Sequence, residues 1–182
     1  MFRDWRSEKE SDWHQVMESD GLRRAITRIS HEILERNGGP EDLVVLGLAN
    51  GGISIGRQIA SNLSQIENSK VPFGVLDVTK FRDDLNVKEI SFIGYEVAEI
   101  PILDGKKVVL VDDVLYTGRT VKASFNALSE MGRPGLIQLA VMVDRGHREI
   151  PIRPDYVGKN LPTSKAEKVV VRDDGIYLAK GL

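Results

Sequence analysis

The sequence predicts an α/β protein in which a mostly parallel, twisted sheet is flanked by helices. The first observation behind this prediction is that short apolar runs alternate along the chain with segments of helical periodicity. Strands that alternate with helices pair in parallel, and the helices cover both faces of the sheet. The second observation is that polar, glycine-containing stretches directly follow two of these runs, at residues 49–52 and 112–120. Parallel sheets bind ligands at the carboxyl ends of their strands, so functional residues are expected there.

The composition is that of one ordinary globular domain. The chain has 182 residues, of which 41% are hydrophobic and 29% are charged. Its net charge of -2 gives no overall attraction to nucleic acid, although a local basic patch would be compatible with it. Cysteine is absent, which excludes disulfides and thiolate metal ligands. Because no apolar run approaches the roughly 20 residues of a membrane span and the first residues are charged, no membrane association and a cytoplasmic location are expected.

The amino-terminal third is expected to form an extension, a helix and the first strand. Residues 1–20 are polar and form an extension to a domain predicted over residues 21–182. A helix is predicted over residues 21–37, ended by the Asn-Gly-Gly-Pro sequence that follows its last turn. The apolar stripe of this helix, at the 3.6-residue period, consists of Leu22, Ile26, Ile29 and Ile33. The continuous apolar run at 43–48 is typical of a strand that is covered on both faces.

The rest of the chain continues the alternation. Further helices are expected at about residues 53–63 and 120–131. The other strands are expected at residues 71–78, 107–112 and 136–143, with shorter ones near 155–157 and 168–171. Residues 79–103 mix charges with short apolar pieces and follow no single period, which indicates an extended arm or hairpin. The apolar residues of the last stretch, 175–182, are candidates to pack on the sheet.

The stretch VVLVDDVLYTGRTV, residues 108–121, carries the chemistry. The run Thr117-Gly118-Arg119-Thr120 stands where a helix is expected to begin, and N–H groups at a helix start bind anions. Gly118 allows close approach, and the threonine hydroxyls and the arginine add donors, so the expected ligand is a phosphate. Asp112 and Asp113 would repel a phosphate but can accept hydrogen bonds from vicinal hydroxyls, and they could support Mg²⁺. Phosphate beside a diol describes a ribose 5-phosphate.

This stretch also has simpler interpretations. In one of them, Asp113 only caps a helix and the threonines belong to a turn. The competing nucleotide motifs do not fit, because the chain has no GxxxxGK[ST] sequence and GLANGG lacks the GxGxxG spacing. The three histidines lack the close spacing of a metal site.

The residues of this stretch resemble the 5-phosphoribosyl-1-pyrophosphate (PRPP) motif of type I phosphoribosyltransferases. Over about residues 20–172 the chain is also similar to the PyrR family, the pyrimidine operon attenuation proteins with uracil phosphoribosyltransferase activity. The segments that carry this resemblance are LRRAITRISHEILERN at 22–37, DVTKFRDDL at 77–85 and LIQLAVMVDRGHREIPIRPDYVGKNLPTSKAEKVVV at 136–171. The last of these is far more specific than the PRPP motif alone.

The resemblance implies an enzyme that transfers phosphoribose from PRPP to uracil, giving UMP and pyrophosphate with Mg²⁺ as cofactor. Asp112 and Asp113 would hold the ribose hydroxyls and the metal, directly or through PRPP, and residues 117–120 would hold the 5′-phosphate. Residues 79–103 would form a flexible hood over the site. Catalytic residues brought close by that hood would be Arg82, Asp83 and Asp84. Without the resemblance, this charged trio reads as a solvated loop.

One departure from the family concerns the loop expected to contact pyrophosphate. The family usually carries Thr-Arg-Gly there, whereas this chain has Asn50-Gly51-Gly52. Backbone amides of a glycine-rich loop still bind anions. The lost charge-assisted hydrogen bond is worth about 1.5–3 kcal/mol, which predicts a reaction roughly ten- to hundredfold weaker unless something compensates.

The resemblance also implies binding of the nascent pyrimidine operon mRNA leader, promoted by UMP or UTP. Basic side chains with threonine and histidine donors suit an RNA backbone and exposed bases. The residue types found at matching positions of the family's RNA-binding face are Arg24, Thr27, Arg28, His31, Arg36, His147, Arg148, Arg153 and Lys159. From the sequence alone, the first group is equally a solvated helix face.

Three functions therefore remain open at this point. The first is a uracil phosphoribosyltransferase that also acts as an RNA-binding attenuator. The second is a UMP-sensing RNA-binding regulator with weak or no catalysis, because of the altered loop at 50–52. The third is a phosphoribosyltransferase for another base, such as orotate or a purine, against which residues 145–165 argue. A homo-oligomer, dimer or larger, is expected from the resemblance.

Overall fold

A computed structural model describes residues 13–49, 51–81 and 102–180, and it contains two sheets and three α-helices in that part of the chain. The strands are β1 (Trp13–Glu18), β2 (Leu43–Leu48), β3 (Phe73–Leu76), β4 (Lys107–Leu115), β5 (Leu136–Asp144), β6 (Tyr156–Asn160), β7 (Glu167–Arg172) and β8 (Gly175–Lys180). The helices are α1 (Ser19–Asn37), α2 (Gly52–Ile66) and α3 (Arg119–Met131), with a short 3₁₀ helix at Thr79–Phe81. None of these helices is long and apolar enough to cross a membrane.

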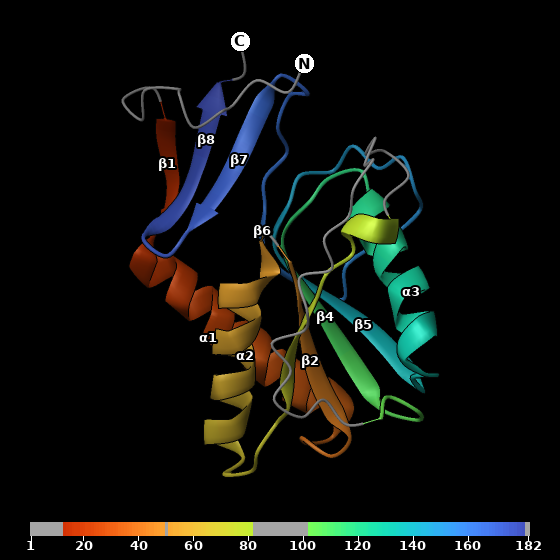
Figure 1. Cartoon of the computed structure of the whole chain (residues 1–182). Helices are drawn as coiled ribbons and strands as arrows, with labels where there is room; N and C mark the ends of the chain where they lie inside the picture. The colour runs from red at the N-terminus through yellow and green to blue at the C-terminus, as the bar shows by residue number, and fades with distance from the viewer. Residues whose placement is uncertain (1–12, 50, 82–101, 181–182) are drawn as a thin grey trace.

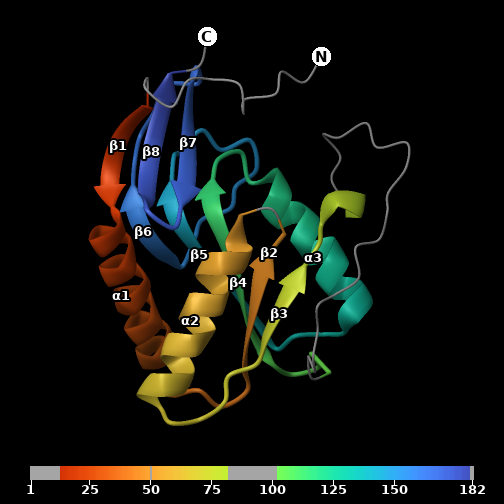
Figure 2. The same ribbon diagram turned by 60° about the vertical axis from the view of Figure 1, so that its left-hand side comes forward.

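The main sheet has five parallel strands in the order β3-β2-β4-β5-β6. Figures 1 and 2 show α1 and α2 on one face of this sheet and α3 on the other. The predicted α/β class with a mostly parallel, helix-flanked sheet is therefore confirmed. All five of its strands contain or overlap the runs expected from the sequence, and β4 continues three residues further, to Leu115.

Alternation along the central strands builds a core on each face. Val109 and Val111 of β4 are fully buried with α1 and α2, whereas Val108 and Leu110 are fully buried with α3. Because side chains alternate along a strand, two buried faces require a continuous apolar run. The stripe predicted on α1 lies in the first core, and Gly38 ends that helix in the left-handed conformation with φ 69°.

A second, three-stranded antiparallel sheet was not expected from the sequence. Its order is β1-β8-β7, so the chain segment before α1 pairs with the carboxyl-terminal strand (Figure 1). The register shifts between Gln15 and Met17, which breaks the two-residue alternation that would have marked β1 as a strand. The expected packing of the terminal apolar residues is confirmed for Ile176, which is fully buried in the α1–α2 core.

Ile176→Ala should lower the free energy of unfolding by about 2–5 kcal/mol, because it leaves a cavity where the small sheet meets the main core. Urea denaturation followed by circular dichroism measures this change. The control is Ile102→Ala, since Ile102 is 77% exposed and should change stability little. Equal effects of the two substitutions would show that the small sheet is not packed into the core.

Candidate functional site

β4 ends at the site and presents its two carboxylates on different faces of the sheet. Asp112 follows the alternation of Val108 and Leu110 and is only 7% exposed, whereas Asp113 follows that of Val109 and Val111 toward α2. The register pairs Asp112 with Val141 of β5, and both carboxylates belong to β4, the central strand of the sheet. The predicted acid pair is thus held by regular strand geometry.

The Asp113 carboxyl group is held by the backbone and is largely desolvated. Its Oδ1 accepts a hydrogen bond of 2.7 Å from the Val114 N–H, and the Asp113 N–H donates to Asp112 Oδ1 over 3.0 Å. Burial raises the pKa of Asp113 above its ordinary value of 3.8, and hydrogen bonds to its carboxyl group, with that from the Val114 N–H the largest, oppose the shift. A buried carboxylate with spare acceptor capacity suits neutral donors such as ribose hydroxyls.

The predicted phosphate loop leads into α3. Gly118 has φ 91°, a left-handed conformation that favours glycine, and α3 begins at the next residue. The Arg119 N–H donates to Thr117 Oγ1 over a long distance of 3.4 Å, and the N-cap residue, Gly118, has no side chain with which to cap the helix. The first-turn N–H groups have no partner within the helix, so they suit an oxyanion. The Arg119 side chain reaches Glu149, with 2.8 Å between its Nε and Oε2 of that residue.

The start of α2 meets the acid pair at the same end of the sheet. A Cβ atom added at Gly51 would collide with the Asp113 carboxyl group, and one at Gly52 would collide with the Val111 carbonyl oxygen. The glycine loop after β2 and the Asp113 carboxylate of β4 are therefore in direct contact. Asn50, the first residue of the predicted pyrophosphate loop, lies outside the described residues.

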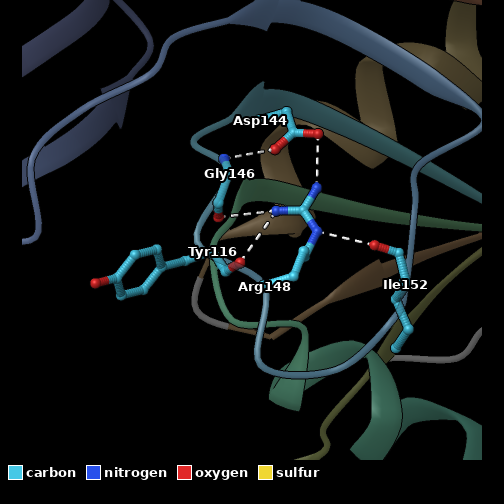
Figure 3. A network of polar contacts seen from close by, with 5 residues as sticks. All are labelled: Tyr116, Asp144, Gly146, Arg148 and Ile152. Carbon is cyan, nitrogen blue, oxygen red and sulfur yellow. Dashed lines mark hydrogen bonds and ion pairs between the residues drawn. The ribbon is translucent and has the colours of Figure 1, made fainter.

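The segment that follows β5 runs along the phosphate loop. The carbonyl oxygen of Thr117 accepts hydrogen bonds from the N–H groups of Glu149 and Ile150, at 3.0 and 3.1 Å. Arg148, predicted from the resemblance to contact RNA, donates instead to oxygens of its own chain (Figure 3). His147 is exposed, adopts φ 57° and places its ring edge-on to Tyr116 at 5.6 Å between centroids.

Arg145 and Tyr116 were not among the site residues predicted from the sequence. Arg145 is only 7% exposed, and its guanidinium lies 4.2 Å from the centre of the Tyr116 ring. It also donates to Thr163 Oγ1 and to the carbonyl oxygens of Ser164 and Glu167, at 2.8, 3.2 and 2.7 Å. These contacts join the start of β7 to the residue that precedes the phosphate loop. An arginine directly after a buried strand was the only available signal.

The basic residues predicted on α1 form one surface. A hollow of about 620 Å³ is lined by Asp20, Arg23, Arg24, Thr27, Arg28 and His31. Arg28 Nη2 donates to the carbonyl oxygens of Val157 and Gly158 on β6, at 2.7 and 3.1 Å, which brings this surface beside Lys159. Arg36 pairs with Asp155 at 2.8 Å. His147, Arg148 and Arg153 belong instead to the segment that follows β5.

The predicted hood of the site lies largely outside the described part of the chain. Arg82, Asp83 and Asp84 lie outside the described residues, as does most of the 79–103 segment. Their catalytic roles therefore stay predictions.

Comparisons with known proteins agree with this geometry. A family model described as a phosphoribosyl transferase domain matches residues 12–174. A bifunctional protein PyrR from Roseiflexus sp. (strain RS-1) is 48% identical, over 91% of this chain and 94% of that protein. The bifunctional protein PyrR of Brevibacillus brevis is 54% identical, over 86% and 88% of the two chains. The chain belongs to the PyrR family of phosphoribosyltransferases. The family and the enzyme class predicted from the sequence are confirmed.

Solved structures show the same fold in other phosphoribosyltransferases. The hypoxanthine phosphoribosyltransferase of Trypanosoma cruzi superimposes with a TM-score of 0.67, is 18% identical and covers 92% of this chain and 97% of its own. A hypoxanthine-guanine phosphoribosyltransferase from Bacillus anthracis gives a TM-score of 0.62 at 18% identity, with 81% of each chain covered. At this identity the likeness concerns the fold alone, so it does not indicate a purine base as substrate.

Asp113→Asn should raise the melting temperature at neutral pH. Burial raises the pKa of Asp113, so the folded state retains this proton where the unfolded chain has released it. The resulting stability is complete below pH 3.8 and is lost as pH rises through the raised pKa. Asparagine has no charge to bury, and each kcal/mol of relieved cost raises the melting temperature by about 2–4 °C.

Scanning fluorimetry at pH 7.5 and at pH 4.5 measures the difference between variant and wild type. The gain should be larger at pH 7.5. Asp174→Asn, at an exposed aspartate in the turn between β7 and β8, serves as the control. A gain at Asp113 that does not depend on pH would contradict a buried, destabilised carboxylate.

Proposed function

We propose that this PyrR protein catalyses the transfer of phosphoribose from PRPP to uracil, forming UMP, and regulates pyrimidine operon expression by binding the leader RNA. The observation that carries the enzymatic part is the placement of two carboxylates at the end of β4 beside two helix starts. Asp113 contacts the beginning of α2, and the loop after β4 leads directly into α3. An acceptor pair flanked by two anion-binding helix ends matches a ribose that carries a phosphate at one end and a diphosphate at the other.

Different residues of the site bind different parts of PRPP. Asp112 and Asp113 accept hydrogen bonds from the ribose hydroxyls, and residues 117–120 surround the 5′-phosphate with backbone N–H groups and hydroxyls. As the bond to pyrophosphate breaks, positive charge develops on the ribose, and the neighbouring carboxylates stabilise it. Water is excluded by the hood expected over residues 79–103, which prevents hydrolysis of PRPP.

The residues at the site fit Mg²⁺ bound together with substrate. In the described part of the chain, no group of three or more histidine, aspartate or glutamate side chains gathers as a metal cage. Magnesium is usually held by one or two carboxylates together with substrate phosphates. Asp112 and Asp113 would be those carboxylates, acting directly or through PRPP. When bound, the ion neutralises negative charge on the departing pyrophosphate.

The glycine loop at 51–52 sets the rate. The cation usual in the family at residue 51 is missing, and a side chain there would collide with Asp113. Pyrophosphate is therefore held by backbone amides. The second candidate function, a UMP-sensing RNA-binding regulator with weak catalysis, rests on this one observation.

The RNA-binding part of the proposal rests on the α1 surface. Arg24, Thr27 and His31 line its hollow, and Arg28 connects it to β6 beside Lys159. Cations, hydroxyls and imidazoles in one hollow suit single-stranded RNA better than any apolar ligand. A cytoplasmic location belongs to the same proposal, because the protein must meet nascent transcripts there. A homo-oligomer is also part of the proposal, as expected from the resemblance to the family. UMP or UTP in the phosphoribosyl site is the signal for RNA binding.

Formation of UMP from radiolabelled uracil, PRPP and Mg²⁺ tests the enzymatic part. Gly51→Ala should lower kcat/KM for PRPP by about tenfold or more, because its Cβ displaces a carboxylate that binds the ribose. Gly51→Arg should not exceed the wild type, since the same collision accompanies the added cation. Gly38→Ala is the control, because it strains a left-handed residue with φ 69° at the far end of α1.

The outcomes separate the two candidate functions. Wild-type turnover on uracil supports the enzyme. Bound UMP without turnover, with activity that appears in Gly51→Arg, supports the sensor instead. Turnover on hypoxanthine or orotate but not on uracil would remove the uracil assignment altogether.

Arg24→Gln should weaken binding of RNA transcribed from the leader of the organism's own pyrimidine operon. If Arg24 contacts a phosphate, the slope of log K against log salt should become shallower by about 0.7. Filter binding with UMP present, at several salt concentrations, measures both quantities. Arg57→Gln changes the same net charge at an exposed residue of α2 and should alter neither. Equal losses in the two variants would indicate nonspecific attraction only.

A further inference from the structure

Arg148 makes an unusually complete set of hydrogen bonds inside the protein. Its Nε donates to the carbonyl oxygen of Ile152 at 2.8 Å, and its Nη1 donates to those of Tyr116 and Gly146, both at 3.0 Å. Its Nη2 donates to Asp144 Oδ2 at 2.6 Å (Figure 3). Four hydrogen bonds therefore start from a side chain with five N–H groups.

These bonds join three parts of the chain at one point. Tyr116 directly precedes the phosphate loop, Asp144 ends β5, and Ile152 lies beyond the turn that follows that strand. The Asp144 carboxylate also accepts the Gly146 N–H at 2.9 Å, which closes the turn around the guanidinium. The position of the Tyr116 carbonyl, and with it the entry into the phosphate loop, is thus tied to the end of β5.

The rest of the turn follows the same loop. Glu149 and Ile150 donate their N–H groups to the carbonyl oxygen of Thr117. A Cβ added at Gly118 would stand 3.5 Å from Ile150, within ordinary contact distance. The turn therefore packs against the phosphate loop, and the ion pair between Arg148 and Asp144 connects the turn to the end of β5.

Burial and geometry separate Arg148 from the other predicted RNA contacts. Its side chain is 20% exposed and pairs with an Asp144 side chain that is 17% exposed, whereas the side chain of Arg36 is 54% exposed. A planar guanidinium reaches several oxygens in fixed directions, which the single ammonium of lysine does not reproduce. Sharing these donors with RNA phosphates would require the turn to open.

We propose that Arg148 is a positioning residue for the phosphate loop, acting through the Tyr116 carbonyl and the turn at 146–152 rather than through contact with RNA. This inference rests on the proposed phosphoribosyl function of the site. It concerns binding of the 5′-phosphate, which PRPP and UMP share, and leaves the chemical step to the carboxylates.

Arg148→Lys tests the inference, because lysine keeps the positive charge but lacks the planar guanidinium that donates to several oxygens at once. A displaced phosphate loop weakens binding in the ground and transition states alike, so KM for PRPP should rise about tenfold while kcat changes less than about threefold. The dissociation constant of UMP, measured by calorimetry, should rise by a similar factor. A merely destabilised protein would instead show a lower active fraction, with reduced kcat and an unchanged KM.

Two further variants complete the experiment. Arg133→Lys, at an exposed arginine in the turn before β5, should leave KM, kcat and UMP affinity unchanged. Asp144→Asn keeps the shape of the ion pair and removes its negative charge, so it should raise KM for PRPP in the same direction by a smaller factor. If Arg148→Lys fails to fold, Asp144→Asn alone still tests the positioning role through its effect on KM for PRPP.

The outcomes keep this inference apart from the proposed function. Unchanged PRPP and UMP binding in both variants, with RNA affinity lost in Arg148→Lys, overturns the positioning role and restores an RNA contact. A wild type that binds UMP without turnover removes the catalytic proposal, and calorimetry still decides the role of Arg148. A wild type that binds neither PRPP nor UMP overturns both proposals.

Discussion

The contact between the Asp113 carboxyl group and the glycine backbone that begins α2 is the constraint on which the site depends. β4 is the central strand of the main sheet and delivers this acid on the α2 side, while β2 leads into α2 through Gly51 and Gly52. A Cβ at residue 51 would occupy the place of the carboxylate. The absence of a cation in this loop is therefore not an isolated loss, because it is coupled to where the neighbouring acid lies.

The same constraint makes the site costly to fold. Desolvation raises the pKa of Asp113, so the charged form of this carboxyl group is disfavoured in the folded protein. The two apolar cores on the faces of the sheet provide the stability that offsets this cost. A ligand whose hydroxyl groups donate hydrogen bonds to the Asp113 carboxylate, and whose oxygens accept hydrogen bonds from the helix N–H groups, removes part of this desolvation cost. Ligand binding and folding stability should consequently be coupled in this protein.

Local chemistry explains which features the sequence could predict. Continuous apolar runs marked β2, β4 and β5 because both faces of the sheet are buried there, and Thr117–Thr120 marked the phosphate loop because its donors are adjacent in the chain. β1 could not be found in the same way, since its register shifts between Gln15 and Met17 and its partner, β8, is at the other end of the chain. The contact between Gly51 and Asp113 likewise exists only after β2 and β4 have paired.

Arginines show most clearly where sequence-based prediction stops. Arg24 and Arg148 carry the same charge and both match residue types of an RNA-binding face, yet one lines an open hollow and the other is surrounded by carbonyl and carboxylate oxygens. A guanidinium binds a phosphate or a set of carbonyls with the same donors, so its identity cannot tell which it meets. The deciding information is the conformation of the neighbouring turn. Because Asp144 and Gly146 supply their oxygens within four residues of Arg148, the turn satisfies its own arginine before any ligand arrives.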